Sequence, residues 1–354
     1  MLIGLNFAAD NDRCIGASGG CLSGENASDG RIGKEKSTMP GSGVYSRQER
    51  FVALRYNSVM SQSNQIISSF SDADADVDFE RRFGGIARLY GDDALDRFRA
   101  AHVCVVGVGG VGSWVVEALA RSAIGRLTLI DLDNVAESNM NRQIQALQDT
   151  LGMAKVAALA ERIAQINPWC KVTQVEDFVD PDNLDAMIGA HGYDYVIDAI
   201  DSVQAKTALI AYCRARCIPL VTVGGAGGQT DPTRIEIKDL CRTEQEPLLA
   251  KVRKRLRQQH GFPRGTKTKF GIDAVYSTEP LQYPKSGEAC SVDADDRAGV
   301  TGLNCAGFGS AMVVTASFGM AAAALVLRKL AAAAKEARSS PETEKNTTAE
   351  VTPL

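Results

Sequence analysis

The sequence predicts an α/β fold with a Rossmann-like, doubly wound and mainly parallel sheet. Three observations support this class. Short β-branched runs alternate with helical patterns through the middle of the chain, a glycine-rich turn from Gly107 to Gly112 follows the first run, and Asp131 and Asp201 follow two later ones. Consecutive parallel strands are joined by right-handed crossovers, so the alternation indicates one sheet covered by helices.

The expected elements follow in order along the chain. Strands are expected at residues 102–106, 126–130, 171–176, 194–198 and 219–223, and helices at 113–124, 151–167, 182–188, 202–216 and 247–259. The strands are short runs rich in β-branched residues, whereas the helical segments are longer and carry apolar residues at helical spacing. Pro168 is expected to end the second helix, because proline cannot continue the hydrogen-bond pattern.

Composition indicates a soluble globular protein. Of 354 residues, 45% are hydrophobic and 23% are charged, which excludes collagen-like, wholly disordered and disulfide-scaffold classes. The net charge of −4 argues against a chain that coats nucleic acid along its whole length. Nine cysteines show no recurring spacing and no CxxC pair, so we expect a reducing, cytoplasmic setting and no zinc site.

Three parts of the chain differ in composition. Residues 1–78 are rich in Gly, Ser and Asp and are expected to be a disordered extension; Met60 is a candidate translation start, which leaves open whether residues 1–59 occur in the native protein. Residues 79–332 are expected to form one ATP-binding domain, and residues 333–354 a flexible tail.

The segment 306–327 is uncharged and long enough to cross a bilayer. Its many Gly, Ala, Ser and Thr residues favour a buried core or dimer-interface helix, with membrane association as the alternative.

The glycine-rich turn predicts a nucleotide site. Gly107, Gly109 and Gly112 stand between a strand and a helix, where glycines allow the backbone to approach a phosphate and free N–H groups attract its charge. Asp131 ends the next strand, where a carboxylate can accept hydrogen bonds from ribose hydroxyls. A nicotinamide dehydrogenase would show the same pattern, so the turn alone does not identify the nucleotide.

Two cations after this strand favour ATP over a hydride carrier. Arg142 and Lys155 follow Asp131 at a spacing that can place both beside the phosphates, where each would neutralise charge on a leaving pyrophosphate. This pattern points to adenylation. The stretch from Asp198 to Ser202 offers carboxylates for Mg²⁺, with Asp201 the candidate ligand, although one of these residues is also expected to cap the following helix.

Taken together, these residues resemble the ubiquitin-activating-enzyme-like adenylating superfamily, which includes the molybdopterin and thiamine sulfur-carrier adenylyltransferases of the HesA/MoeB/ThiF type. The resemblance implies magnesium-ATP binding and the joining of a carboxylate to AMP. It assigns ATP binding to Gly107, Gly109, Gly112, Asp131, Asn139, Arg142, Lys155 and Asp201, and catalytic roles to the last three of these.

Residues 80–330 resemble more specifically the tRNA threonylcarbamoyladenosine dehydratase family, through the segments 82–91, 198–202, 218–229 and 304–309. This implies ATP-dependent cyclisation of the threonylcarbamoyl group on a tRNA adenosine, with release of AMP. It also implies a homodimer in which a catalytic arginine reaches the partner's ATP site, Arg82 being the candidate and Arg88 the alternate. A cysteine desulfurase or sulfur-acceptor partner is implied by the same resemblance, and a monovalent-cation requirement is left open.

The cysteines are mostly expected to be inert. Some relatives carry a cysteine where this chain has Ala274, which weakens a persulfide or thioester role there. Cys241, Cys290 and Cys305 are candidate redox thiols, whereas Cys213 and Cys217, one helical turn apart, are expected to be packed side chains.

A cationic run predicts the tRNA surface. Residues 251–269 hold eight Lys or Arg and no acid, and the candidate contacts are Lys251, Arg253, Lys254, Arg255 and Arg257. Such a run can neutralise backbone phosphates, although a solvated helix face would show the same composition.

Three other functions stay open at this point. A sulfur-carrier-protein adenylyltransferase would use the same activation chemistry on a different acceptor. A nucleotide-gated RNA scaffold without catalysis and a nicotinamide oxidoreductase are the remaining two.

Overall fold

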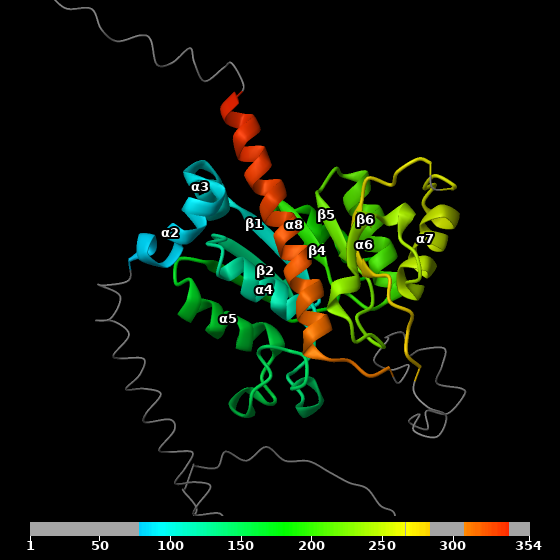
Figure 1. Cartoon of the computed structure of the whole chain (residues 1–354), viewed down its shortest axis with the longest axis horizontal. Coiled ribbons are helices and arrows are strands. Elements are labelled where there is room, and N and C mark those ends of the chain that lie inside the picture. The colour runs from blue at the N-terminus through cyan, green and yellow to red at the C-terminus, as the bar shows by residue number, and fades with distance from the viewer. Residues whose placement is uncertain (1–77, 266, 284–307, 340–354) are drawn as a thin grey trace, which may run out of the picture. The chain divides into compact units, whose positions relative to one another are not determined.

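Figure 1 shows the computed structural model of the chain, which describes residues 78–265, 267–283 and 308–339. The chain divides into two units, Met1–Asp76 and Val77–Leu354, and the described residues belong to the second. The predicted disordered extension up to residue 77, Met60, Cys290, Cys305 and the tail beyond residue 339 therefore lie outside the described residues.

A seven-stranded sheet in the order β3-β2-β1-β4-β5-β7-β6 confirms the predicted fold class. All neighbouring strands are parallel except β6, which runs antiparallel to β7. The strands are β1 His102–Val106, β2 Arg126–Ile130, β3 Lys171–Val175, β4 Tyr195–Asp198, β5 Leu220–Val223, β6 Ile235–Asp239 and β7 Asp273–Ser277. The first five were predicted from the sequence, whereas β6 and β7 were not.

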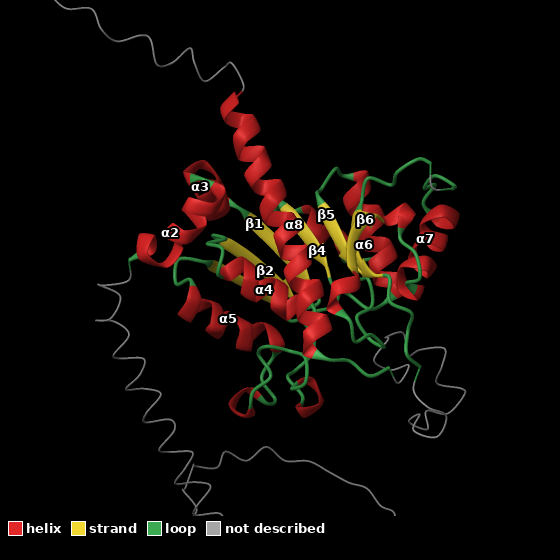
Figure 2. Cartoon of the chain, viewed as in Figure 1, coloured by secondary structure: helices red, strands yellow, loops and turns green. Residues whose placement is uncertain are grey.

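Helices cover both faces of the sheet (Figure 2). They are α2 Phe79–Tyr90, α3 Asp92–Ala100, α4 Gly112–Ala120, α5 Lys155–Ile166, α6 Val203–Ala215, α7 Pro247–Gln259 and α8 Met312–Ser339. In β1, Val103 and Val105 face a core built with α3, α4, α5 and α8, whereas Cys104 and Val106 face a second core built with α6 and α7. This alternation follows from the two-residue period of a strand.

Helix boundaries differ from the predicted ones for local reasons. The predicted helix at 247–259 is confirmed as α7. The helix expected from residue 151 begins at Lys155, because the preceding residues pair with the chain at Asn134 and Val135. The helix expected to reach residue 124 ends at Ala120, before Ala123 adopts a left-handed φ of 63°. Residues 182–188 form only a short π-helical turn at Asp185–Gly189.

Helix α8 is a long apolar helix that begins and ends later than the segment 306–327 and extends past residue 332. Among the described residues, only Met312–Arg338 is long and apolar enough to cross a membrane, with a mean hydropathy of 1.5. Of the apolar 18-residue stretch of this helix, 61% is buried in the protein. Val314, Phe318, Ala322 and Val326 are fully buried in the core that α8 shares with α4. A core helix in a soluble protein has this pattern of burial.

Gly319 lets α8 approach the start of α4. A Cβ atom at Gly319 would lie 2.7 Å from the Val111 carbonyl oxygen and 2.8 Å from the Trp114 Cβ. Neither neighbour is the end of a flexible side chain. The contact therefore ties α8 to the turn that precedes α4.

We predict that Gly319→Ala destabilises the protein, although Gly→Ala inside a helix normally stabilises by about 0.5–1 kcal/mol. Gly85→Ala is the matched control, because Gly85 lies exposed in α2 and an added Cβ there meets only the Arg88 guanidinium at 3.8 Å. Urea unfolding of both variants measures whether each substitution raises or lowers the free energy of unfolding. Stabilisation by both substitutions would contradict the close approach of α8 and α4.

Candidate nucleotide-binding site

The turn between β1 and α4 is built so that only glycine fits at its two ends. Gly107 has a left-handed φ of 82°, and a Cβ at Gly112 would lie 1.8 Å from the Gly107 carbonyl oxygen. In the part of the chain that the structure describes, the backbone N–H groups of Gly109 and Gly110 have no acceptor. The turn therefore presents free donors at the start of a helix, the arrangement that binds phosphate.

Asp131 closes this turn from the end of β2. Its carboxylate accepts hydrogen bonds from the backbone N–H of Val108 at 2.8 Å and of Asp133 at 3.0 Å. Asp131 lines the cleft, as predicted, and it also fixes the backbone that leads into the glycines.

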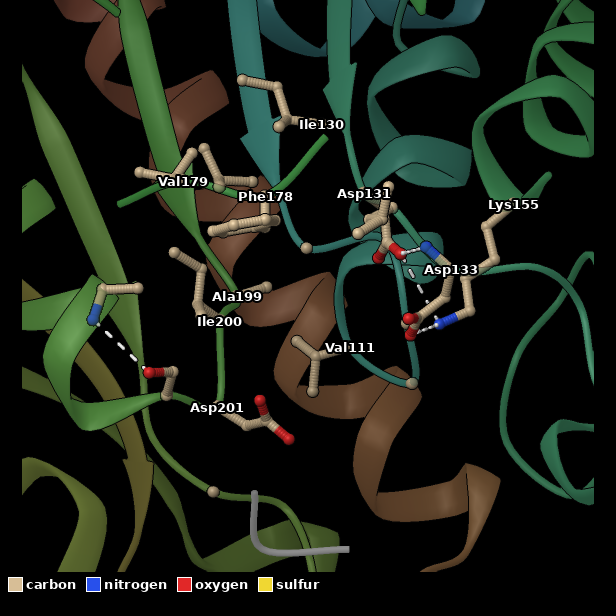
Figure 3. Close-up of a pocket in the computed structure, with 18 of the residues that line it drawn as sticks. Val111, Ile130, Asp131, Asp133, Lys155, Phe178, Val179, Ala199, Ile200 and Asp201 are labelled. Atoms are coloured by element: carbon tan, nitrogen blue, oxygen red, sulfur yellow. Dashed lines mark hydrogen bonds and ion pairs between the residues drawn. The ribbon is translucent and has the colours of Figure 1, made fainter. Parts of the chain in front are cut away.

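Lys155 begins α5 and directs its ammonium group at two carboxylates (Figure 3). Nζ lies 2.6 Å from Asp133 Oδ2 and 3.6 Å from Asp131 Oδ1. The Lys155 side chain is buried, whereas Asp133 is 72% exposed, so Asp133 can turn to solvent when phosphate oxygens take its place. Asp133 is a site residue that the sequence interpretation missed, although it lies within the segment that drew attention to Arg142.

Arg142 lies over the glycine turn. Its Cδ would be 3.3 Å from a Cβ at Gly110, and its guanidinium donates to the Ser138 carbonyl at 2.7 Å and to Asn141 Oδ1 at 2.9 Å. Burial lowers the pKa of the Arg142 guanidinium.

Asn139 supports the loop that carries Arg142. It is buried, and its Oδ1 accepts the backbone N–H of Ala136 at 3.1 Å. Trp114 Nε1 donates to the Arg142 carbonyl at 2.9 Å, which fastens the loop to α4. Asn139 thus has a clear structural role within the cleft, beside the ATP-binding role that was expected.

The end of β4 forms the opposite wall, where a buried ion pair decides which acidic residue is available. Asp198 and Lys206 have fully buried side chains, and Lys206 Nζ lies 2.8 Å from Asp198 Oδ2. Lys206 also donates to Thr222 Oγ1 at 3.1 Å, and this hydroxyl donates to Asp198 Oδ2 at 2.7 Å. The Asp198 carboxylate is therefore engaged by Lys206 and Thr222 and is not available to a ligand.

Asp201 is left as the free carboxylate of this wall. Ser202 caps α6 by accepting the Ala205 N–H at 3.4 Å, which gives the predicted capping role to the serine. Asp201 is exposed and lines the cleft, on the far side from Lys155 (Figure 3).

Asp201 fits the predicted magnesium role. The described residues contain no group of three or more His, Cys, Asp or Glu that could hold a metal ion by themselves. Mg²⁺ bound with ATP needs only one or two protein carboxylates, because phosphates and water supply the other ligands.

These walls enclose a cleft of about 670 Å³ at the carboxyl ends of the parallel strands, within the usual size of a ligand site. Ile130, Phe178, Val179 and Ile200 form an apolar part of the lining, and Lys155 lies across the cleft from them (Figure 3). The glycine turn, Arg142 and Asp201 also line the cleft, as do Asp177 and Asp180 beside the apolar part. Apolar side chains together with cations match the two halves of a nucleotide. The segment 177–181 was not predicted as part of the site.

Arg82 lies outside the cleft of its own chain. Its guanidinium donates to the carbonyls of Gln165 at 3.1 Å and Ile166 at 2.8 Å, at the end of α5. Lys155 begins the same helix, about 17 Å away at 1.5 Å per residue. Arg88 is exposed on α2. A catalytic role for either arginine would require a second copy of the chain, as the resemblance implies, and it stays a prediction.

The predicted tRNA residues divide into two groups on α7. Lys251 and Lys254 are exposed and Arg255 is half-buried, and none has an ion-pair partner among the described residues. The other two are held by the protein itself. Arg253 donates to the Thr243 hydroxyl, and Arg257 donates to the carbonyls of Pro263 at 3.2 Å and Gly265 at 3.1 Å while its guanidinium lies over Phe270.

The thiol predictions are partly wrong. Cys213 is buried, and burial raises the pKa of its thiol to about 12, as expected for a packed side chain. Cys217 is instead exposed, because the chain leaves α6 there with a left-handed φ of 56°. Cys241 is buried, and burial raises the pKa of its thiol, which disfavours the reactive thiolate.

Comparisons with known proteins identify the family of the chain. The model of the ThiF family matches residues 83–351. The chain is 56% identical to tRNA threonylcarbamoyladenosine dehydratase of Escherichia coli over 258 residues, which cover 72% of this chain and 96% of that protein. It is 53% identical to the Haemophilus influenzae protein of the same name over 253 residues, covering 71% and 94%.

A crystal structure of the E. coli tRNA N6-threonylcarbamoyladenosine dehydratase in complex with ATP superimposes with a TM-score of 0.65 at 53% identity, covering 74% of this chain and 98% of that one. Fold and cleft together define a nucleotide-binding α/β protein with a Gly-rich phosphate turn. The chain belongs to the ThiF family and, within it, to the tRNA threonylcarbamoyladenosine dehydratases. The predicted resemblance is confirmed.

We predict that Lys206→Met lowers the free energy of unfolding by about 3–5 kcal/mol, because it leaves the Asp198 carboxylate buried without a counter-charge. Lys238→Met is the matched control, since the Lys238–Glu236 pair is about 40% exposed and such pairs contribute about 0–1 kcal/mol. Urea denaturation measures both. Equal small losses would show that the buried pair does not stabilise this wall.

Proposed function

We propose that this chain catalyses the ATP-dependent dehydration of N6-threonylcarbamoyladenosine in tRNA to its cyclic form. The observation that carries the proposal is the 56% identity to the E. coli dehydratase over 96% of that protein's length. The cleft supports it, because it combines a phosphate turn, the cations Arg142 and Lys155 and the exposed Asp201 carboxylate with apolar side chains that can contact a base.

ATP would lie with its base near Phe178 and Val179 and its phosphates along the glycine turn. Arg142 and Lys155 would balance the negative charge that develops on the leaving pyrophosphate. Asp201 would hold Mg²⁺ together with the phosphates.

The reaction needs two steps. A carboxylate oxygen of the threonyl group attacks the α-phosphorus of ATP, and the bond to pyrophosphate breaks. The ureido group of the same molecule then attacks the activated carbonyl carbon, the bond to AMP breaks, and the ureido proton is lost to solvent. Since both reacting groups belong to one substrate, proximity favours the second step and no protein nucleophile is required. None of the described residues lining the cleft is a cysteine.

The tRNA backbone would contact the cations of α7 that have no ion-pair partner among the described residues. Lys251, Lys254 and Arg255 can bind phosphates without breaking internal contacts, whereas Arg253 and Arg257 hold the helix and the following loop. The proposed surface is therefore narrower than the five residues expected from the sequence.

A second copy of the chain would complete the assembly. Arg82 is exposed, and Met312, Val313 and Met320 leave apolar surface exposed on α8. We propose that a homodimer covers part of this surface and brings Arg82 of one copy towards the ATP of the other. In this assembly α8 would be covered by the core and by the second copy and not by lipid. We therefore propose that the protein is cytoplasmic.

We expect pyrophosphate release from ATP with tRNA that carries the threonylcarbamoyl mark and none with unmodified tRNA. Asp201→Asn should abolish this release, because the carboxylate that would hold Mg²⁺ is lost, while the fold stays intact at an exposed position. Release driven instead by a sulfur-carrier protein would support the adenylyltransferase alternative. Retained turnover in Asp201→Asn would show that another group holds the metal.

We predict that the triple variant Lys251→Ala, Lys254→Ala, Arg255→Ala raises the KM for tRNA by roughly 10-fold or more at moderate salt, because three phosphate contacts are lost. The KM for ATP should stay unchanged. The control Lys171→Ala, Arg328→Ala, Lys335→Ala removes the same charge from exposed positions on other elements. A similar rise in the KM for tRNA in both triple variants would show that the loss of net charge weakens tRNA binding, and that α7 makes no specific contact.

A further inference from the structure

Glu246 is a buried carboxylate at the start of α7 that neither the cleft chemistry nor the tRNA surface uses. It is 3% exposed. Its Oε1 accepts the backbone N–H of Gly225 at 3.1 Å and of Leu248 at 3.2 Å, and its Oε2 accepts that of Leu249. Glu246 therefore caps α7 and also binds a loop from another part of the fold.

The loop that Glu246 binds is a wall of the cleft. Residues 224–227 follow β5 and line the cleft, and Leu248 lines it beside them. A Cβ at Gly224 would lie 3.0 Å from Glu246 Cγ, so the loop backbone packs directly on this side chain. The same loop is held from β7 by a hydrogen bond from the Gly224 N–H to the Val275 carbonyl at 2.8 Å.

The helix on the other side of this contact carries the proposed tRNA surface. Lys251, Lys254 and Arg255 lie in the same helix, within two to three turns of Glu246. One side chain thus fixes the cleft wall relative to the helix on which the tRNA backbone would rest.

We propose that Glu246 is a positioning residue for the reaction. It holds residues 224–227 of the cleft wall at a fixed position relative to α7, so that the carboxylate carried by the tRNA meets the α-phosphate of ATP. This inference rests on the proposed function. Three N–H donors converge on Glu246, and only a carboxylate accepts all three with both oxygens. In Glu246→Gln the amide NH₂ must face at least one of these donors.

Burial and the local partners of Glu246 act on its carboxyl group in opposite directions. Burial raises the pKa of its carboxyl group, and the nearby Lys206 ammonium together with the three N–H donors acts in the opposite direction. Lys206 forms its ion pair with Asp198, so Glu246 is held by the three N–H donors rather than by a salt bridge among the described residues.

The test compares Glu246→Gln, Glu246→Ser and Glu246→Asp with wild type, using marked tRNA and ATP. Glu246→Gln should lower kcat by on the order of 10- to 100-fold, since small misplacements of reacting groups cost this much. The ATP Kd should stay within about threefold, because the glycine turn and the cations lie on the other wall. Glu246→Asp, which keeps the charge and a preferred helix cap, should restore most of kcat.

Asp239→Asn is the matched control. The Asp239 carboxylate also accepts three backbone N–H groups, from Cys241 at 3.0 Å, Phe270 at 3.0 Å and Gly271 at 2.8 Å. It lies opposite the first residue of β7, at the sheet end away from the cleft. This variant should lose comparable stability and keep kcat within about threefold of wild type.

Glu246→Ser keeps a helix-capping hydroxyl but is too short to reach Gly225, so it tests the loop contact even where Glu246→Gln fails to fold. A wild-type kcat in Glu246→Ser, or equal loss in Asp239→Asn and Glu246→Gln, would overturn the positioning role. A higher ATP Kd with an unchanged kcat would also overturn the positioning role. Wild-type protein that fails to convert marked tRNA would instead overturn the proposed function, and the inference with it.

Discussion

The buried ion pair between Lys206 and Asp198 is the interaction on which the cleft depends. It joins the end of β4 to α6 and, through Thr222, to β5. These contacts fix the backbone from Ala199 to Asp201, against which the glycine turn packs so closely that a Cβ at Gly107 would lie 2.9 Å from the Ala199 carbonyl oxygen. Loss of the pair would therefore disturb both walls, whereas a surface ion pair would affect neither.

The charges of the cleft are arranged so that a nucleotide can replace groups of the protein. Lys155 is neutralised by Asp131 and by the exposed Asp133, while Arg142 is held by a carbonyl and an amide oxygen and pairs with no carboxylate of the described residues. Phosphate oxygens can displace these weak or exposed partners at low cost. Asp198 and Glu246 are instead enclosed by donors, whereas the exposed Asp201 carboxylate lines the cleft and has no partner among the described residues.

The sequence predicted what depends on local pattern. The first five strands, the glycine turn and α7 were recoverable because periodicity and turn chemistry encode them within a few residues. The strands β6 and β7 were missed, since β6 is only half-buried and β7 follows a long connection. The roles of Lys206, Glu246 and Phe178 depend on segments distant in sequence, and the left-handed turn that exposes Cys217 gives no composition signal. Which arginines of α7 are available could likewise be read only from their internal partners.

The most direct test of the central claim follows an oxygen atom. Marked tRNA labelled with ¹⁸O in the threonyl carboxylate should transfer one labelled oxygen to the phosphate of AMP, because the carboxylate attacks the α-phosphorus and the ring closes with loss of AMP. Mass spectrometry of the released nucleotide measures this transfer. Labelled AMP in stoichiometric yield with the cyclic product is the predicted result. Unlabelled AMP, or label in inorganic phosphate together with ADP, would contradict adenylation of the threonyl carboxylate.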